Sequence, residues 1–155
     1  MRRALIVLVA AVVTSLATAQ KAIVLSLEQS GADEIVENLW NNTTAPHSNG
    51  ITADESLNEK CELENTTQTD LYIYKADPAI ATGQAVVVVP GGGYRKICIK
   101  YDGFEVAKYL RSIGITAVLV KYRLPNGHYE VPLEDAQRAM HYTRTEGAKW
   151  GVDPA

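Results

Sequence analysis

The sequence has few residues that hold metal ions and no excess of positive charge. It contains only two cysteines and three histidines, and these are too dispersed to match a recognised zinc-binding spacing. The formal net charge is −3 at pH 7, and charges of both signs are spread along the chain. Proteins that bind nucleic acid present a basic patch or stripe. We therefore expect neither a metal site nor a nucleic-acid partner.

The two cysteines, Cys61 and Cys98, allow two interpretations. In an exported protein they could form a disulfide, because oxidising compartments favour such bonds. They could equally be buried thiols, since their separation along the chain says nothing about their distance in space. The sequence leaves both interpretations open.

Two kinds of nucleotide-binding loop are also missing. A phosphate-binding loop requires Gly-Lys followed by Ser or Thr, and this tripeptide does not occur in the chain. A dinucleotide-binding loop requires a third spaced glycine at the start of its helix, where this sequence has Lys96. The glycine-rich stretch that the chain does contain therefore indicates a different use.

Residues 1–19 are predicted to form a cleaved secretory signal peptide. Arg2 and Arg3 form a positive n-region, residues 4–13 an apolar h-region, and the Ala-Thr-Ala at 17–19 matches a cleavage site. The apolar run is too short to cross the ~30 Å hydrocarbon core of a bilayer comfortably as a permanent helix. We therefore expect cleavage after the last alanine, a secreted or periplasmic location, and no membrane attachment of the mature chain.

The mature chain is expected to have two parts. Residues 20–68 are mostly polar, with Trp40 and Ile51 as isolated apolar points, and are predicted to form an irregular N-terminal segment. Residues 69–155 alternate between strand and helix patterns and are predicted to form a truncated α/β domain.

Within the second part, the patterns predict strands at 71–74, 85–89 and 115–122, and helices at 102–113 and from Pro132 onward. This order indicates the α/β class, with a mostly parallel sheet and flanking helices. The strand at 85–89 is apolar throughout, which is typical of a strand covered on both faces.

Three glycines follow the strand at 85–89, separated from it only by Pro90. Gly91, Gly92 and Gly93 precede Tyr94, and so place flexible backbone at the carboxyl end of a strand. In open α/β sheets the ligand crevice lies at this end of the strands. Glycines let backbone N–H groups converge on a developing negative charge without a Cβ in the way. The pattern indicates an oxyanion hole, and the alternative is a tight turn with no catalytic role.

Four segments together resemble the α/β-hydrolase esterases of the feruloyl or acetyl esterase type, which occur among secreted enzymes that degrade plant polysaccharides. The segments are Pro-Gly-Gly-Gly-Tyr at 90–94, Tyr-Asp-Gly-Phe-Glu-Val-Ala at 101–107, Val-Lys-Tyr-Arg-Leu at 120–124, and Pro-Leu-Glu-Asp-Ala-Gln-Arg-Ala at 132–139. Leu39-Trp40 and Ala45-Pro46 also resemble the N-terminal loop of the family. The likeness covers most of the mature chain and implies the N-terminal half of an α/β-hydrolase sheet.

The resemblance implies roles for the glycine loop. Gly91 and Gly92 would supply backbone N–H groups to the oxyanion hole, Gly93 would let the loop turn, and Tyr94 would line the acyl pocket. Pro90 stands where related esterases have the histidine of a His-Gly-Gly-Gly loop, and this change leaves the backbone donors available.

The implied reaction is acyl transfer by a serine, with a histidine and a carboxylate as partners and without a cofactor. The substrate would be a small ester or an acylated oligosaccharide of plant cell walls. One alternative keeps the fold and cleaves a peptide or lactone bond, because those reactions also pass through an oxyanion. An alternative of another class is a non-catalytic carbohydrate-binding protein or a remnant.

The nucleophile motif of the family is missing. It is Gly-x-Ser-x-Gly on a strand-to-helix turn, followed in the chain by the acid and the histidine. The nearest match, at 46–50, begins with proline and follows no buried strand, so we interpret it as a loop. His128 and His141 are expected at the surface or in packing, and the position of Asp135 in the first turn of a helix is explained by the helix dipole. We therefore expect the N-terminal part of a longer hydrolase, inactive as written.

Overall fold

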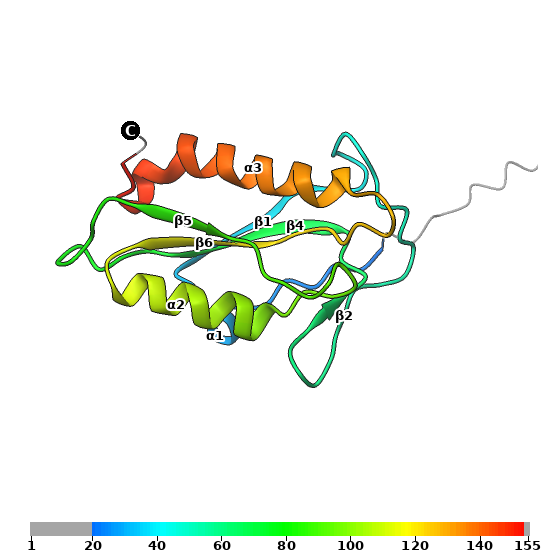
Figure 1. The fold of residues 1–155 in the computed structure, drawn as a ribbon, viewed down its shortest axis with the longest axis horizontal. Coiled ribbons are helices and arrows are strands. Elements are labelled where there is room, and N and C mark those ends of the chain that lie inside the picture. The colour runs from blue at the N-terminus through cyan, green and yellow to red at the C-terminus, as the bar shows by residue number, and fades with distance from the viewer. Residues whose placement is uncertain (1–19, 154–155) are drawn as a thin grey trace, which may run out of the picture.

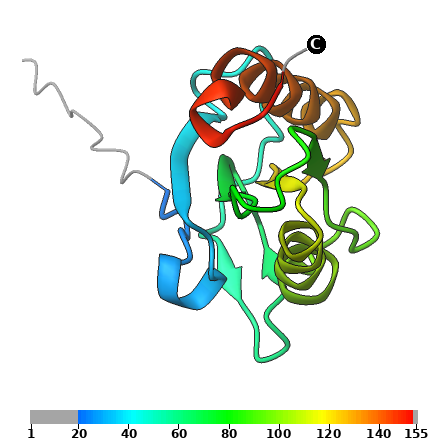
Figure 2. The same cartoon turned by 90° about the vertical axis from the view of Figure 1, so that its left-hand side faces the viewer.

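The computed structural model describes residues 20–153, so the predicted signal peptide lies outside the described residues. The described chain forms three layers, in which one four-stranded sheet separates two helices (Figure 1). Helix α3 (Glu130–Glu146) covers one face, and helix α2 (Glu105–Ser112) covers the other. Figure 2, turned by 90°, shows the same two helices on opposite sides of the sheet.

The sheet has the strand order β1-β4-β6-β5. These strands are β1 (Glu34–Asn41), β4 (Gln68–Tyr74), β6 (Thr116–Lys121) and β5 (Ala85–Val88). The predicted α/β class with flanking helices is confirmed, with one correction. Of the three strand pairs only β5–β6 is parallel, whereas β1–β4 and β4–β6 are antiparallel, so the described part of the sheet is mixed rather than mostly parallel.

The connections between the strands explain this mixture. A parallel pair needs a crossover of a dozen or more residues, usually containing a helix. Helix α2 provides such a crossover between β5 and β6. The link from β4 to β5 consists of residues 75–84, contains no helix, and returns the chain in the opposite direction. The alternation of strand and helix therefore describes the connection from β5 to β6, but not the connection from β4 to β5.

The core lies between the two inner strands and the helices that cover them. All six residues of β6 are buried, as are six of the seven residues of β4. The strand predicted at 85–89 is less covered than its apolar sequence suggested, because Val86 is 39% exposed and Val89 is 47% exposed. The reason is that β5 is the edge strand of the described sheet.

Both helix predictions are confirmed with shifted boundaries. The first region begins with a π-helical turn, η1 (Ile99–Phe104), which continues into α2. Gly114 ends it with a φ of +82°, and a Cβ at this position would overlap the backbone of Ile80. Helix α3 begins two residues before Pro132. Among residues 20–153, no helix is long and apolar enough to cross a membrane.

The expectation that residues 20–68 are irregular is wrong for β1 and for three shorter elements. The shorter elements are α1 (Leu27–Ser30), β2 (Ser56–Leu57) and β3 (Leu63–Glu64). The register of β1 shifts between Val36 and Trp40, and Asn38 within it has a φ of +50°. Such a bulge breaks the alternation of apolar and polar residues that identifies a strand in a sequence.

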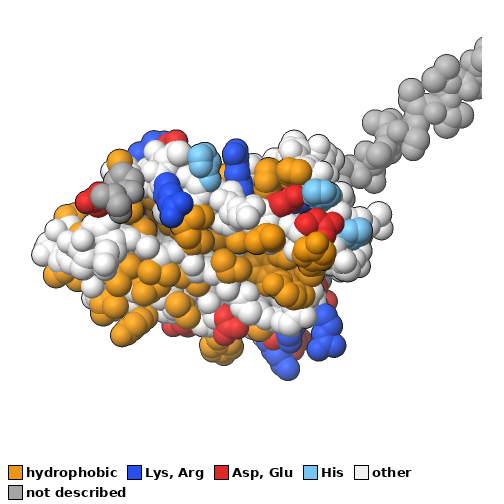
Figure 3. Space-filling view, turned by 45° about the horizontal axis from the view of Figure 1, so that its top comes forward, with side chains coloured by type: hydrophobic (Ala, Val, Ile, Leu, Met, Phe, Trp, Pro, Cys, Tyr) orange, Lys and Arg blue, Asp and Glu red, His pale blue; other side chains and the backbone are white. Residues whose placement is uncertain are grey.

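Hydrophobic side chains also reach the surface. Figure 3 shows them gathered in a band across the face that it presents, below the charged groups of the upper edge. Exposed apolar residues include Val86 of β5, Val89 directly after it, and Leu133 and Met140 of α3. Contiguous apolar surface of this kind marks a place of interaction more often than a free surface.

Candidate functional site

The loops that follow β5, β6 and β1 lie at the same end of the strands, along one edge of the sheet. The carboxyl ends of β5 and β6 lie at this edge because the two strands are parallel. The antiparallel pairings bring the start of β4, at Gln68, and the end of β1, at Asn41, to the same edge. The glycine loop at 90–94 follows β5 directly and therefore lies where the ligands of α/β sheets bind.

The backbone of the loop requires glycine at position 92. Gly92 has a φ of +145°, and a Cβ there would lie 2.7 Å from the carbonyl carbon of Lys96 and closer still to its oxygen. Gly93 and Tyr94 follow with φ values of +63° and +59°. Three successive residues with positive φ turn the chain sharply, and the non-glycine Tyr94 carries a conformational cost.

The loop has backbone donors without acceptors. The carbonyl of Gly91 accepts a hydrogen bond from the Cys98 N–H at 2.9 Å, and that of Gly92 accepts one from the Arg95 N–H at 3.4 Å. Within residues 20–153, the N–H groups of Gly91, Gly92 and Gly93 have no hydrogen-bond acceptor. Together with Tyr94 they line an open hollow of about 330 Å³. The arrangement suits an anionic oxygen, and the roles of the four residues stay predictions.

Tyr122 and Pro90 fix the start of the loop. The Tyr122 hydroxyl donates to the carbonyl of Pro90 at 3.0 Å, and the Tyr122 side chain is buried. Burial raises the pKa of Tyr122 to about 12. The hydroxyl therefore keeps its proton at neutral pH and remains a donor. The end of β6 is thereby tied to the loop that follows β5.

The backbone N–H of Cys98 anchors the loop at the carbonyl of Gly91. Neither cysteine of the chain is in a disulfide. Both Cys61 and Cys98 are free thiols. Burial is the main cause of a raised pKa at Cys98, so its thiol stays protonated. Next to it, the Lys96 ammonium lies 2.7 Å from the Glu62 carboxylate and ties the loop to the turn between β2 and β3. The hydrogen bond with Glu62 lowers the pKa of that carboxyl.

A second open hollow, of about 410 Å³, shares Tyr94 with the first. It is lined by Ile51, Asn65, Tyr94, Arg95 and the segment 124–127 that follows β6. The Tyr94 side chain is 64% exposed and lines both hollows. The sequence predicted Tyr94 as a lining residue but gave no sign of Arg95 or of the segment after β6.

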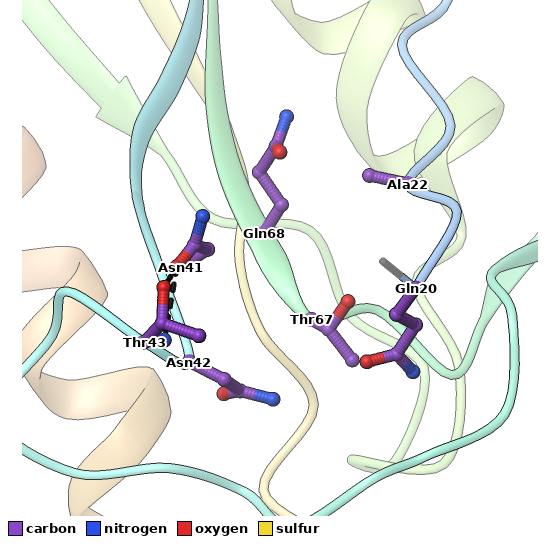
Figure 4. Close-up of a pocket in the computed structure, with 7 residues that line it drawn as sticks. All are labelled: Gln20, Ala22, Asn41, Asn42, Thr43, Thr67 and Gln68. Atoms are coloured by element: carbon purple, nitrogen blue, oxygen red, sulfur yellow. Dashed lines mark hydrogen bonds between the residues drawn. The ribbon is translucent and has the colours of Figure 1, made fainter. Parts of the chain in front are cut away.

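A third depression, of about 220 Å³, lies where β1 ends and β4 begins. Figure 4 shows its lining, which consists of Gln20, Ala22, Asn41, Asn42, Thr43, Thr67 and Gln68. The side chains are amides, hydroxyls and one methyl group, so the depression holds neither a base nor a nucleophile activated by one. It lies at the same edge of the sheet as the glycine loop, but at the β1 side of the sheet, whereas the glycine loop follows β5 on the opposite side.

A buried ion pair joins α3 to the end of β6. The Asp135 carboxylate accepts from the Arg123 guanidinium at 2.7 and 3.0 Å, and both side chains are fully buried. The Trp40 indole N–H donates to the same carboxylate at 2.6 Å. The prediction that Asp135 lies in the first turn of a helix, where the dipole would explain it, is wrong, because α3 begins at Glu130 and Asp135 is its sixth residue. Only the fold shows that it neutralises a buried arginine twelve residues earlier in the chain.

The histidines lie apart from the glycine loop. His47 forms an ion pair with Glu134, and this hydrogen bond raises the pKa of His47. The Ser48 hydroxyl accepts only a local hydrogen bond from Gly50, so the segment 46–50 is a loop, as predicted. His128 and His141 are exposed, also as predicted, and none of the three histidines lines the hollow at the glycines.

The remaining buried charges do not form a metal site. Lys121 donates to Asp70 at 2.8 Å and lies 2.7 Å from Glu55, and all three side chains are fully buried. The Lys121 ammonium thus occupies the position between the two carboxylates. Within residues 20–153, no group of three or more His, Cys, Asp or Glu side chains could hold a metal ion.

Comparison with known proteins agrees with this geometry. No protein-family model matches the chain. An acetylxylan esterase from Xylanibacter ruminicola is 32% identical over 77 residues, which are 50% of this chain and 16% of that protein. The crystal structure of an acetyl ester-xyloside bifunctional hydrolase from Caldicellulosiruptor lactoaceticus is 28% identical with a TM-score of 0.53. That likeness covers 78% of this chain and 39% of the other.

The chain therefore spans less than half the length of either protein. In sequence and in fold, the chain is related to esterases of the α/β-hydrolase type, over part of their length.

Proposed function

We propose that the chain is the N-terminal part of a secreted serine carboxylic ester hydrolase that removes acyl groups from plant cell-wall polysaccharide. The observation that carries the proposal is the glycine loop at the carboxyl end of a parallel strand, whose N–H groups find no acceptor in the part of the chain that the structure describes. Such donors stabilise the oxyanion of acyl transfer, and losing one typically costs ~10²- to 10³-fold in kcat. The likeness to an acetylxylan esterase and to an acetyl ester-xyloside hydrolase supports an acetyl ester of a xylan-type sugar as the substrate.

In this proposal the loop does part of the chemistry. Attack of a serine oxygen on the ester carbonyl moves an electron pair onto the carbonyl oxygen, and the N–H groups of Gly91 and Gly92 donate to it. The serine proton passes to a histidine and then to the leaving alcohol, and water later releases the acid. The Tyr122 hydroxyl and the Cys98 N–H hold the loop in position through the carbonyls of Pro90 and Gly91.

The nucleophile, the acid and the histidine of this proposed enzyme lie outside the 155 residues. The sequence contains no Gly-x-Ser-x-Gly, and the loop at 46–50 lacks the strand-to-helix turn that such a serine needs. The exposed Val86 of edge strand β5 and the exposed Val89 directly after it support further sheet beside β5, because soluble proteins normally protect an apolar edge. We therefore propose that the 155 residues alone are inactive.

The test compares two proteins. One is expressed from the complete coding sequence, and the other is the 155-residue chain. Both are incubated with acetylated xylan and p-nitrophenyl acetate, and separately with a fluorophosphonate, which labels activated serines. We expect acetate release and labelling only from the first protein.

Two results would contradict the proposal. If the complete product neither hydrolyses esters nor becomes labelled, it is not a serine esterase, and binding without catalysis is the better interpretation. If the folded 155-residue chain hydrolyses p-nitrophenyl acetate, its catalytic groups lie within the sequence and the assignment of an inactive part is wrong.

A further inference from the structure

We infer that the second hollow, next to Tyr94, is a subsite for a carboxylate-bearing sugar on the alcohol side of the ester, with Arg95 as the residue that selects the carboxylate. The inference rests on the proposed ester hydrolase function and names a substrate class for it. Three observations support it: the hollow lies next to the glycine loop, the Arg95 guanidinium has no partner among the described residues, and the other lining residues are uncharged.

The position of the hollow places its occupant on the same molecule as the reacting ester. Tyr94 lines both this hollow and the one around the glycine N–H groups, so the two are separated by a single side chain. The volume, about 410 Å³, is within the range of sites for small molecules. Tyr94 has a φ of +59°, and backbone strain of this kind persists where the surrounding structure holds it.

Among the described residues that line the hollow, Arg95 is the only charged one, and its guanidinium is available. Among residues 20–153 the Arg95 side chain has no hydrogen-bond or ion-pair partner, although it is flanked by a lysine that does. Lys96 is occupied by Glu62 at 2.7 Å. No acidic residue lines the hollow. A planar guanidinium binds a carboxylate through two parallel hydrogen bonds, which an ammonium cannot do.

The rest of the lining suits the body of a sugar. Asn126 donates one hydrogen bond to the carbonyl of Asn49 at 2.8 Å, which leaves its amide oxygen as an acceptor for a hydroxyl. Asn65 adds a second amide, and the exposed ring of Tyr94 offers an apolar face next to its hydroxyl. Ile51 and Pro125 complete an apolar floor. Neutral hydrogen-bonding groups around one cation fit a uronic acid better than a neutral sugar or a phosphate.

The test measures binding directly, so that it does not depend on hydrolysis. Methyl β-D-glucuronide and methyl β-D-glucoside differ only in a carboxylate against a hydroxymethyl group. Each is titrated into the protein expressed from the complete coding sequence, and Kd is measured by NMR at low salt. We expect the wild type to bind the glucuronide about tenfold more tightly, the effect of one charge-assisted pair.

Variants identify the residue responsible. Arg95→Gln is expected to bring the two Kd values within about twofold of each other, while Arg95→Lys keeps part of the preference because it keeps the charge. Arg144→Gln is the matched control, since this exposed arginine lies near the end of α3 and outside the hollow. Equal binding of the two sugars by the wild type would overturn the inference. A preference for the glucuronide that persists in Arg95→Gln would also overturn the inference.

Kinetics separate this inference from the proposed function. For acetylated oligosaccharides with and without a glucuronyl unit, the wild type is expected to show the higher kcat/KM on the acidic substrate, and Arg95→Gln to lose that ratio. An active esterase without any acidic preference would overturn the subsite and leave the proposed function standing. Selective glucuronide binding by a protein that cleaves no ester would overturn the proposed function and leave the carboxylate-binding site standing.

Discussion

Replacing Gly92 by alanine tests whether the glycine loop is fixed by its close approach to Lys96. A Cβ at this position would lie 2.7 Å from the Lys96 carbonyl carbon, so the backbone must move by several tenths of an ångström or more. The φ of +145° adds a conformation that side chains rarely adopt. Strained backbone costs about 1–3 kcal/mol by itself, and the overlap adds to it. We expect Gly92→Ala to lower the free energy of unfolding by about 3 kcal/mol or more.

Gly93→Ala is the matched control. Gly93 is the next residue and also has a positive φ, of +63°, but a Cβ there meets no atom within 4 Å. Its cost should therefore be only that of alanine in the left-handed region, about 1–2 kcal/mol. The difference between the two variants isolates the steric contact from the backbone conformation.

The assay is urea unfolding of the protein expressed from its complete coding sequence, followed by circular dichroism, with hydrolysis of p-nitrophenyl acetate as a second readout. We expect Gly92→Ala to be less stable than Gly93→Ala by about 1–2 kcal/mol, and to lose more kcat because the donors move. Equal stability of the two variants would refute the reasoning from close approach. Unchanged kcat in a folded Gly92→Ala protein would refute a catalytic role for this backbone.

Three further predictions concern individual hydrogen bonds and ion pairs. Tyr122→Phe removes the hydrogen bond to Pro90 and should cost about 1 kcal/mol of stability. Its kcat should fall by a larger factor than its KM changes. Kinetics identical to those of the wild type would argue against a positioning role. Asp135→Ala leaves a buried arginine without its partner and should cost about 3–5 kcal/mol in urea unfolding, so a loss below 1 kcal/mol would contradict the ion-pair account. The raised pKa of His47 means that its pair with Glu134 stabilises the fold below pH 6.5, the ordinary value, and less as pH rises through the raised pKa. His47→Gln should therefore lower Tm at about pH 5.5 and leave it unchanged in alkaline solution, and a pH-independent difference would contradict this.

Several elements were predictable because their signals are local. The strand at 85–89, the glycines after it and the helix ended by Gly114 each follow from residues that are neighbours in the chain. A β-branched run, a break by glycine and a helical spacing of apolar residues act over a few positions. These signals also carried the resemblance to esterases, which the comparisons support.

Other elements depend on contacts between distant residues and were missed or misjudged. Strand β1 was missed because a bulge at Asn38 interrupts its pattern, and the strand is held by pairing with β4 some 30 residues later. The antiparallel direction of β4 was not visible because it depends on which strand lies beside it. The pairing of Arg123 with Asp135 required the end of β6 and the start of α3 to meet in the core.

The sequence by itself determined the α/β class and the place of the glycine loop after a strand, since backbone conformation and apolar periodicity are properties of short segments. Only the tertiary structure decided what surrounds that loop. Across residues 20–153 it leaves the glycine N–H groups without acceptors and Arg95 without a partner, pairs Lys96 with Glu62, and places Tyr94 beside two hollows. Those properties depend on which distant groups come within a few ångströms, and hydrogen bonds and ion pairs act only at that range.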